Sequence, residues 1–494
     1  MTGTHHGLTR LDQLVKSCIE GEGPTRPFAQ TFGRLFPANP VQIKNITHAD
    51  VIQALDNLAS DMAATENTDG PADAGMTFLG QFIDHDITLD ATSALGTRID
   101  PAMIPNVRTP SLDLDCVYGA GPEASPHLYG ADEAEQFLVF GRAENPRDLA
   151  RTCAGKALIG DPRNDENIIV AQIQAIFIEL HNLLMSKRVE DGDTAKDIHA
   201  CAHEGMAEHT WHAHVHPKLR SFEEVRRFIR LHYQWVVWNE LLPSFVAEEC
   251  LKWALESTGF GWNAPVMPVE FSGACYRFGH ATTQFKYALR QGEAPKGLFA
   301  LPGFGPRPVD GNIDYDMFFS MNGGSTSQKA RPVGPKLGSP LLNLPFVHDG
   351  IKLADIDETL TVDQARNLAL RNMIRDRYTY QLASGQHVAA RLGTPGVPVP
   401  PQLAEKGFTK TPLWFYSLQE AETHGSGKLT GAGGRIVASV FANLLKRDST
   451  TFLHIPHFKP WNGFGGQPSI FAGMIAYVEA NRSHIQHADA LRCG

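Results

Sequence analysis

The sequence predicts a mainly α-helical protein with little β structure and long loops; its length fits roughly three domains or one large domain with insertions. Apolar residues recur at helical spacing in several segments, whereas stretches of alternating apolar and polar residues are almost absent. Segments 291–345 and 394–402 are dense in glycine and proline, which favours surface loops between helices. Of the 494 residues, 42% are hydrophobic and only 20% are charged, so the chain can form a large core and is neither disordered nor a coiled coil.

The first half of the chain favours two helices separated by loop. Residues 1–75 are mixed, and their prolines favour an extended arm and loop, whereas MTFLGQFIDHD at 76–86 favours a short buried helix. Residues 95–160 are rich in proline, glycine and aspartate and favour loop. The clearest helix spans 167–188, where large apolar residues recur three or four positions apart and form one wide stripe.

Helix-start signals mark the second half. Ser221 and Glu224 form a capping-box pattern at the start of a helix that can run to Pro243. The same pattern, a threonine and a glutamine three residues apart, precedes the segment ARNLALRNMIRDR at 365–377. A further helix is expected at about 434–446.

Charge, hydropathy and cysteine use exclude several classes of protein. A net charge of −10 disfavours a nucleic-acid partner. No stretch of 18 apolar residues is present, so no membrane span is expected. The first residues lack the apolar core of a classical signal peptide, which favours a cytoplasmic protein or export by a non-classical route. The seven scattered cysteines form no CxxC pair and are expected to be free, mostly buried thiols.

The segment GQFIDHD at 80–86 carries the first candidate site. On a helix Gln81 and His85 share one face, Asp84 lies close to that face, and Asp86 is turned away. A histidine, an amide and a carboxylate can therefore line one pocket while a second carboxylate faces elsewhere. The competing interpretation is a core histidine flanked by solvated acids.

Two further segments contain candidate ligands. GDPRNDEN at 160–167 precedes the strongest helix and places Arg163 and Glu166 three residues apart. The alternative there is a surface ion pair near a helix N-terminus, where acidic residues are favoured. In YRFGHATTQ at 276–284, His280 is either a metal ligand or a packed core histidine.

Oxygen-bearing residues alternate in the loop segment TPSLDLDCVYG. Alternate side chains of an extended loop point the same way, so two carboxylates, two hydroxyls and the intervening carbonyls suit a hard cation such as calcium. An Asx-rich turn is the alternative. The residues concerned are Thr109, Ser111, Asp113 and Asp115.

A histidine-rich segment, HTWHAHVH, leads toward the Ser221 helix. A zinc or nickel site is conceivable there. No carboxylate or thiol lies at a useful spacing, so a solvent-exposed loop is favoured. The histidines are His209, His212, His214 and His216.

Five segments together resemble the animal-type haem peroxidases of the peroxidase–cyclooxygenase superfamily, most closely its bacterial branch. They are FLGQFIDHDIT, GDPRNDEN, YRFGH, LALRNMIRD, and PLWFYSLQEAE with the following GGRIVASVFANLL. Each is weak alone, but five in the family's order and at family-like spacing are specific, and they override the alternative for each motif. The resemblance implies one haem peroxidase domain at 31–485, with an N-terminal arm at 1–30 and a C-terminal tail at 486–494.

The resemblance implies a role for each residue of a haem site. His85 corresponds to the distal histidine and Arg163 to the distal arginine, with Gln81 beside them. His280 corresponds to the proximal histidine that ligates the haem iron. Asn372 corresponds to the asparagine that accepts a hydrogen bond from that histidine.

Carboxylates complete the implied cofactor sites. Asp84 and Glu166 correspond to the residues that form ester bonds to haem methyl groups, so a haem b derivative is expected. Asn167 stands where some mammalian members carry a methionine, so a third, sulfonium link is not expected. The implied Ca²⁺ ligands are Asp86, Thr109, Ser111, Asp113 and Asp115.

Arg277 is a further haem-binding candidate and separates two activities found on this fold. Cyclooxygenases and plant-type fatty-acid dioxygenases carry a tyrosine at this position, whereas Tyr276 is one residue off and is expected to point elsewhere. The resemblance therefore implies a haem peroxidase that reduces hydrogen peroxide through a ferryl intermediate and oxidises a halide, thiocyanate or small aromatic donor. A fatty-acid dioxygenase and a non-enzymatic haem- or calcium-binding protein are the alternatives.

Overall fold

The structure is a computed structural model. It describes residues 31–40, 43, 46–90, 93–130, 136–190, 221–257, 260, 267–301, 303–485 and 487. The expected arm at 1–30, the histidine cluster at 209–216 and all of the expected tail except His487 lie outside these residues.

Helices dominate the described residues, which confirms the predicted mainly α-helical fold. The helices are α2 (His48–Asp61), α3 (Ala74–Ile87), α4 (Asp115–Tyr118), α5 (Ile168–Glu190), α8 (Phe222–Val236), α9 (Leu242–Phe245), α10 (Glu248–Glu256), α11 (Val269–Ser272), α12 (Gly279–Thr282), α13 (Val362–Arg366), α14 (Leu368–Ile374), α15 (Gly385–Leu392), α16 (Pro401–Ala404), α17 (Leu413–His424), α18 (Gly431–Arg447) and α19 (Ile470–Asn481). In the same part of the chain the strands form three two-stranded sheets. They are β1 (Ala63–Ala64) with β4 (Leu337–Gly338), β2 (Lys286–Tyr287) with β3 (Lys296–Gly297), and β5 (Ile351–Leu353) with β6 (Glu358–Leu360).

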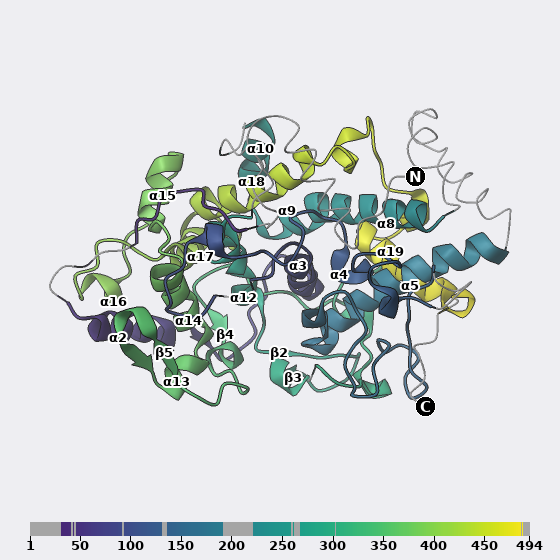
Figure 1. Cartoon of the computed structure of the whole chain (residues 1–494), viewed down its shortest axis with the longest axis horizontal. Helices are drawn as coiled ribbons and strands as arrows, with labels where there is room; N and C mark the ends of the chain where they lie inside the picture. Colours follow the sequence, from purple (N-terminus) through teal and green to yellow (C-terminus); the bar gives the residue numbers. More distant parts are fainter. Residues whose placement is uncertain are drawn as a thin grey trace.

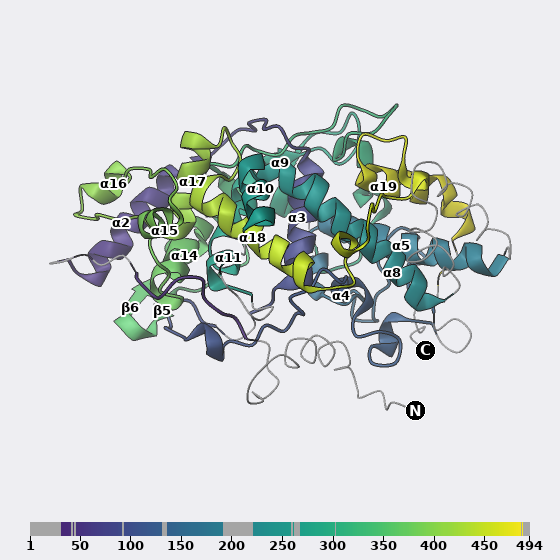
Figure 2. The same ribbon diagram turned by 90° about the horizontal axis from the view of Figure 1, so that it is seen from above.

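The molecule is elongated, and α3 lies near its centre (Figures 1 and 2). Helices α5, α8 and α19 lie toward one end, and α2, α14, α15 and α16 lie toward the other. Long irregular segments connect the helices, as the glycine- and proline-rich composition predicts. The central position of α3 matters because this helix carries most of the first candidate site.

Aromatic packing fixes α3 against its neighbours. Phe82 of α3 stacks on Phe177 of α5, with ring centroids 4.9 Å apart and an interplanar angle of 7°. Tyr233 of α8 meets both rings edge-on, at 6.2 Å from Phe82 and 5.7 Å from Phe177. Such pairs contribute about 0.5–1.5 kcal/mol each beyond the burial of their area. The face of α3 that carries Phe82 is therefore held rigidly.

The two helices predicted in the first half are confirmed as α3 and α5. By length and composition alone, the Ile168–Ser186 stretch of α5 is apolar enough to cross a membrane. All of that stretch is buried inside the protein, as in the core helix of a folded domain. This stretch is the one such candidate among the described residues.

The helix that opens at Ser221 extends further than predicted. Ser221 accepts a hydrogen bond from the Glu224 N–H at 3.4 Å, and α8 begins at the next residue. The helix does not stop at Pro243, because a π-helical turn at Val237–Leu241 shifts the hydrogen-bond register before α9 begins. Pro243 then lies in the first turn of α9, where a proline needs no partner for an N–H.

The capping pattern before residues 365–377 also forms, but it starts a shorter helix than expected. Thr361 and Gln364 make the reciprocal pair, with N–H to side-chain distances of 3.2 and 3.0 Å. Helix α13 ends after five residues, and the Asn367 side chain then caps α14 by accepting from the Leu370 N–H at 3.1 Å. One predicted helix is therefore two.

The cysteines follow the expectation at three positions and not at a fourth. Cys116, Cys250 and Cys275 are buried free thiols. Cys153 is disulfide-bonded, so the prediction of free thiols is wrong there. A spacing pattern within the chain does not reveal a single bridge between distant residues.

Candidate active site

His85 is a buried side chain on α3 whose ring proton has a defined position. Its Nδ1 lies 2.8 Å from Asn164 Oδ1, an atom that can only accept a hydrogen bond. Nδ1 therefore carries the proton, and Nε2 keeps a free lone pair. Burial, followed by the nearby charge of Arg163, lowers the pKa of His85 to about 4, so the ring is neutral near pH 7.

Arg163 is tied to the C-terminal end of the same helix. Its Nη2 donates to the Thr88 carbonyl at 2.6 Å and to the His85 carbonyl at 3.2 Å. The short 3-10 turn Pro162–Asp165 places it there. The predicted partners His85 and Arg163 thus lie together, although they are far apart in sequence.

Asp161 is a functional candidate that the sequence analysis missed. This fully buried carboxylate accepts a hydrogen bond from Arg163 Nη2 at 2.8 Å and forms an ion pair with Arg108, whose Nε lies 2.8 Å away. Burial alone would raise its pKa, but the hydrogen bond and charge of Arg163 and the charge of Arg108 hold it below its usual value. Asp161 is therefore ionised and fixes Arg163. Its position before a proline at the start of the turn was the available signal.

Gln81, Asp84 and Glu166 lie on the same side of α3 and interact. The Gln81 amide nitrogen donates to Glu166, and the Gln81 oxygen accepts from Asn167 Nδ2 at 3.2 Å. Asp84 accepts from the Thr88 hydroxyl at 2.9 Å. Glu166 is exposed to solvent, yet desolvation raises its pKa to about 7, against the opposing charge of Arg163.

His280 lies on α12, which packs against α3 through Thr282 and Thr77, with hydroxyl oxygens 2.9 Å apart. The ring is only partly buried by surface area, yet its pKa falls to about 3 through desolvation, then through the charges of Arg277 and Arg375. A side chain added at Gly279 would meet no atom within 4 Å. The space beside Gly279, the residue before His280, is therefore open.

Asn372 contacts His280 as predicted, but with the opposite end of its amide. Its Nδ2 lies 3.0 Å from His280 Nδ1, whereas its Oδ1 accepts from Arg375 Nη1 at 3.3 Å. The sequence predicted that Asn372 accepts a hydrogen bond from the histidine. Arg375 accounts for the difference because it holds the amide oxygen. A half-turn of the amide would present that oxygen to His280.

Arginines flank His280. Arg277 donates through Nε to the Ser272 carbonyl at 2.8 Å. Burial, then the charge of Arg277, lowers the pKa of Arg375 to about 9, because like charges disfavour each other. Arg375 was missed although it stands within the LALRNMIRD motif. This flank of the site suits an anionic group.

Three carboxylates predicted to bind calcium come together. Oxygens of Asp86, Asp113 and Asp115 all lie within 4.8 Å of one another. Asp86 also accepts from the Tyr233 hydroxyl at 3.0 Å. Burial and then the charge of Asp113 raise the pKa of Asp86 to about 7. This donor set of clustered hard oxygens in the interior fits a calcium ion.

The hydroxyl residues of that loop are buried beside the carboxylates. The Thr109 N–H donates to Asp115 at 3.5 Å, which brings Thr109 to the cluster. Ser111 is buried in the same loop, and its N–H donates to the Thr109 carbonyl at 2.8 Å. Arg108 pairs with both Asp115 and Asp161, so it links the acidic cluster to Arg163.

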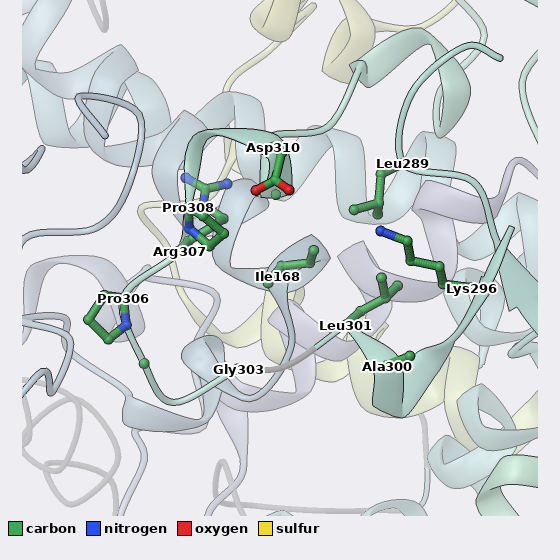
Figure 3. Close-up of a pocket in the computed structure, with 12 residues that line it drawn as sticks. Ile168, Leu289, Lys296, Ala300, Leu301, Gly303, Pro306, Arg307, Pro308 and Asp310 are labelled. Atoms are coloured by element: carbon green, nitrogen blue, oxygen red, sulfur yellow. The ribbon is translucent and has the colours of Figure 1, made fainter. Parts of the chain in front are cut away.

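A cavity of about 170 Å³ lies beside the start of α5. Its apolar wall includes Ile168, Leu289 and Leu301, which are buried. Figure 3 shows the Lys296 amine and the Asp310 carboxylate directed into it from opposite sides. The lining includes neither His85 nor His280.

The wall of this cavity is joined to the Glu166 segment. A side chain at Gly303 would come within 2.1 Å of the Asp165 carbonyl, so only glycine permits this approach. The Phe304 N–H donates to the same carbonyl at 2.6 Å, and Phe304 adopts a left-handed backbone with φ of 54°. The cavity therefore adjoins the segment that carries Arg163 and Glu166.

Comparisons with known proteins show which family the sequence resembles. Residues 91–302, somewhat less than half of the chain, match the family model described as animal haem peroxidase. The matched segment contains Arg163, Glu166 and His280. The sequence likeness over this segment is thus to animal haem peroxidases, as the motifs predicted. These matches do not test the bacterial branch, which stays a prediction.

Individual relatives support the same class. A chorion peroxidase of Drosophila melanogaster is 27% identical over 197 residues, which are 36% of this chain and 22% of that protein. The chain thus spans about a fifth of the length of this curated relative.

Solved structures establish the fold. Peroxidase A of Dictyostelium discoideum superposes with a TM-score of 0.53 at 15% identity, covering 94% of each chain. A fatty acid alpha-dioxygenase of Oryza sativa gives 0.52 at 16% identity, covering 92% of this chain and 82% of that one. The fold is therefore one that peroxidases and fatty-acid dioxygenases share, and the fold alone does not choose between them.

Proposed function

We propose that this protein is a haem peroxidase that reduces hydrogen peroxide to water at the expense of a small electron donor. The observation that carries the proposal is His85, a buried neutral histidine whose Nε2 is free because Nδ1 is bonded to Asn164. Arg163 lies directly beside it. A base of this kind next to a fixed cation suits proton transfer and charge stabilisation during cleavage of an O–O bond.

His280 and the residues around it, together with Asp84 and Glu166, fit a haem group. His280 would hold the iron through Nε2 with the Asn372 amide turned by half a turn, so that its oxygen accepts from Nδ1–H and Nε2 keeps its lone pair. Asp84 and Glu166 would form the ester bonds, and Arg277 with Arg375 would face the anionic edge of the ring. A bound haem would supply the iron at which peroxide is cleaved and the electrons are stored.

His85 and Arg163 would act together in moving one proton. His85 Nε2 takes the proton from the attacking oxygen of the peroxide and returns it to the departing oxygen, which leaves as water. Arg163 stabilises the negative charge that develops on that oxygen. Gln81 stands beside them, held by Glu166 and Asn167. The overall balance is one peroxide, two electrons and two protons to two waters.

The residues that line the cavity beside α5 indicate the class of electron donor. Its apolar wall, with a lysine and a carboxylate at opposite sides, suits a small aromatic donor with an anionic group. Such a donor gives up one electron and one proton, so two donor molecules balance one peroxide. Halide and thiocyanate remain within the proposal, because Arg163 offers a cation to a small anion.

The fatty-acid dioxygenase alternative depends on a tyrosine that this chain lacks at position 277. Arg277 occupies the position and contacts the Ser272 carbonyl. The neighbouring Tyr276 donates its hydroxyl to the Gly80 carbonyl at 3.1 Å. Oxygen uptake with a polyunsaturated fatty acid is expected to be absent, whereas peroxide-dependent oxidation of a phenol is expected. The reverse pattern would establish the dioxygenase.

Two variants test the proposed roles of the histidines. His280→Ala should purify with little or no haem, because the axial ligand is removed. His85→Ala should keep its haem, yet react with peroxide about 10²–10⁴-fold more slowly in stopped-flow measurements. Full haem occupancy with an unchanged Soret band in His280→Ala would contradict the first role. A peroxide rate within a few-fold of the parent in His85→Ala would contradict the second.

The ester links have their own test. After turnover with peroxide, acidified organic solvent should fail to extract the haem from the parent. Glu166→Gln should lose one link and keep the link through Asp84. Clean extraction of unmodified haem from the peroxide-treated parent would refute both esters.

A further inference from the structure

Asn164 lies between His85 and Gln174 and connects them by hydrogen bonds. Its Oδ1 is 2.8 Å from His85 Nδ1, and its Nδ2 donates to Gln174 Oε1 at 2.8 Å. All three side chains are buried, and both amides are fully inaccessible. Gln174 in turn donates through Nε2 to the Cys116 carbonyl at 3.3 Å.

The donor and acceptor of every hydrogen bond in this series are fixed by its last member, the Cys116 carbonyl. The Cys116 carbonyl can only accept, so Gln174 must present its nitrogen to it and its oxygen to Asn164. Asn164 must then present its nitrogen to Gln174 and its oxygen to His85. No hydroxyl, which could reverse its role, stands among these side chains. The series of hydrogen bonds therefore runs in one direction only, and at its other end the donor is the Nδ1–H of His85.

We propose that Asn164 is a positioning residue that holds His85 in the tautomer with its proton on Nδ1, and that Gln174 fixes Asn164 in the orientation this requires. The inference deepens the proposed peroxidase function and rests on it for its catalytic consequence. A neutral imidazole with its proton on Nε2 would present a donor to the peroxide and could not take its proton. The hydrogen bonds of Asn164 and Gln174 therefore keep the Nε2 lone pair of His85 available as a base in every molecule.

A direct measurement of the tautomer needs neither haem nor peroxide. In ¹⁵N-histidine-labelled apoprotein, the ring nitrogens of His85 report which one carries the proton, and His85→Ala assigns the signal. The parent should show Nδ1 protonated, and Asn164→Leu should show a mixture or the other tautomer. A parent His85 protonated on Nε2 would overturn the inference. If peroxide turnover is absent but Nδ1 is protonated, the proposed function is wrong, whereas the role of Asn164 in setting the tautomer is supported.

Kinetics test the catalytic consequence in the holoenzyme. Asn164→Leu should slow the peroxide reaction at least about tenfold, yet by less than the about 10²–10⁴-fold expected for loss of the base itself. KM for the electron donor should stay unchanged, because Asn164 does not face the donor cavity. Asn312→Leu is the matched control, since Asn312 is a buried asparagine that bonds to another amide, that of Asn145. It should change neither the tautomer nor the rate.

A double-mutant cycle distinguishes positioning from general loss of structure. Gln174→Met should slow the reaction in the parent, but it should add little in the Asn164→Leu background, because Gln174 acts only through Asn164. Additive effects of the two substitutions would contradict the claim that Gln174 acts through Asn164. Should Asn164→Leu not fold, Gln174→Met alone still tests it, since an unanchored Asn164 should permit both tautomers. An unchanged tautomer and rate in Gln174→Met would then overturn the role of Gln174.

Discussion

Asp161 illustrates how one buried residue serves two sites. Its carboxylate pairs with both Arg163 and Arg108, and Arg108 also pairs with Asp115 of the acidic cluster. The orientation of Arg163 is therefore set by an ion pair that is not part of the reacting groups. Removing one charge of a buried ion pair lowers the stability of the fold, because the other charge is left buried and unpaired.

We expect Asp161→Asn to loosen Arg163 without removing it. The peroxide reaction should slow by about tenfold, since complete loss of one stabilising donor typically costs about 10²–10³-fold. Haem content should stay near that of the parent. Stopped-flow absorbance measures the rate, and Asp363→Asn, at an exposed aspartate, is the control. A parent-like rate would show that Asp161 does not fix the arginine.

Lys296 gives a prediction about donor choice. Lys296→Glu reverses the one lysine charge that Figure 3 shows facing the cavity. KM for an anionic phenol should rise by a few-fold, consistent with the about 0.2–1 kcal/mol of an exposed ion pair, while the peroxide reaction stays unchanged. Lys352→Glu, at an exposed lysine elsewhere, is the control. Equal KM values in the two variants would exclude the cavity as the donor site.

At the scale of elements, α3 joins the acidic cluster to the reacting groups. Asp86 directly follows His85, and its carboxylate lies close to those of Asp113, in the loop before α4, and Asp115, the first residue of α4. A cation held there would fix the end of α3 to which Arg163 also donates a hydrogen bond. Without a cation, three clustered carboxylates repel one another.

Removal of calcium should therefore loosen α3 before the rest of the fold. A chelator should lower the melting temperature and the peroxidase activity together, and calcium at a hundred times its Kd should restore about 2.7 kcal/mol of stability. Asp113→Ala should behave like the chelated parent while His280 still binds haem. Elemental analysis with thermal melting measures both effects. A parent that carries no calcium, or an active Asp113→Ala variant with calcium bound, would refute the site.

Local patterns predicted the elements, but not the contacts between them. Apolar content was sufficient for α3 and α5, because both helices lie in the core; α5 is buried on every side rather than along one stripe. The π-helical turn at Val237–Leu241 was not predictable, since it depends on packing rather than on a local signal. The same limit explains why Asn164 and Arg375 were missed. Each acquires its role from a histidine more than seventy residues away, and no spacing rule describes such a pair.

At the scale of the whole molecule, several buried carboxyls make folding sensitive to pH. Burial raises the pKa of Glu179, Glu240 and Glu420 to about 7 from an ordinary value of 4.5. A carboxyl whose pKa is raised by folding stabilises the fold most below its unfolded pKa, and this contribution is lost as pH rises through the folded pKa. Stability of the apoprotein should therefore fall between about pH 4.5 and 7.

Glu420→Gln should flatten part of this decline. Glu420 is fully buried on α17 and accepts from the N–H groups of Ala432 and Gly433, both at 3.0 Å, at the start of α18. The neutral amide keeps an acceptor for that helix terminus and does not ionise. The loss of unfolding free energy between pH 5 and 8 should shrink by about 1–3 kcal/mol. Glu422→Gln, at an exposed position on the same helix, should leave the pH profile unchanged, and an identical profile in both variants would contradict the prediction.

The central claim is that this fold brings a free histidine base, an arginine and a haem-ligating histidine to one site. The most direct test is an absorption spectrum of the haem-loaded protein before and after one equivalent of hydrogen peroxide, followed by a phenolic donor. We expect a Soret band that changes within the mixing time of the peroxide and returns to its first form as the donor is oxidised. A protein that takes up no haem, or whose Soret band is unaffected by peroxide, would contradict the account.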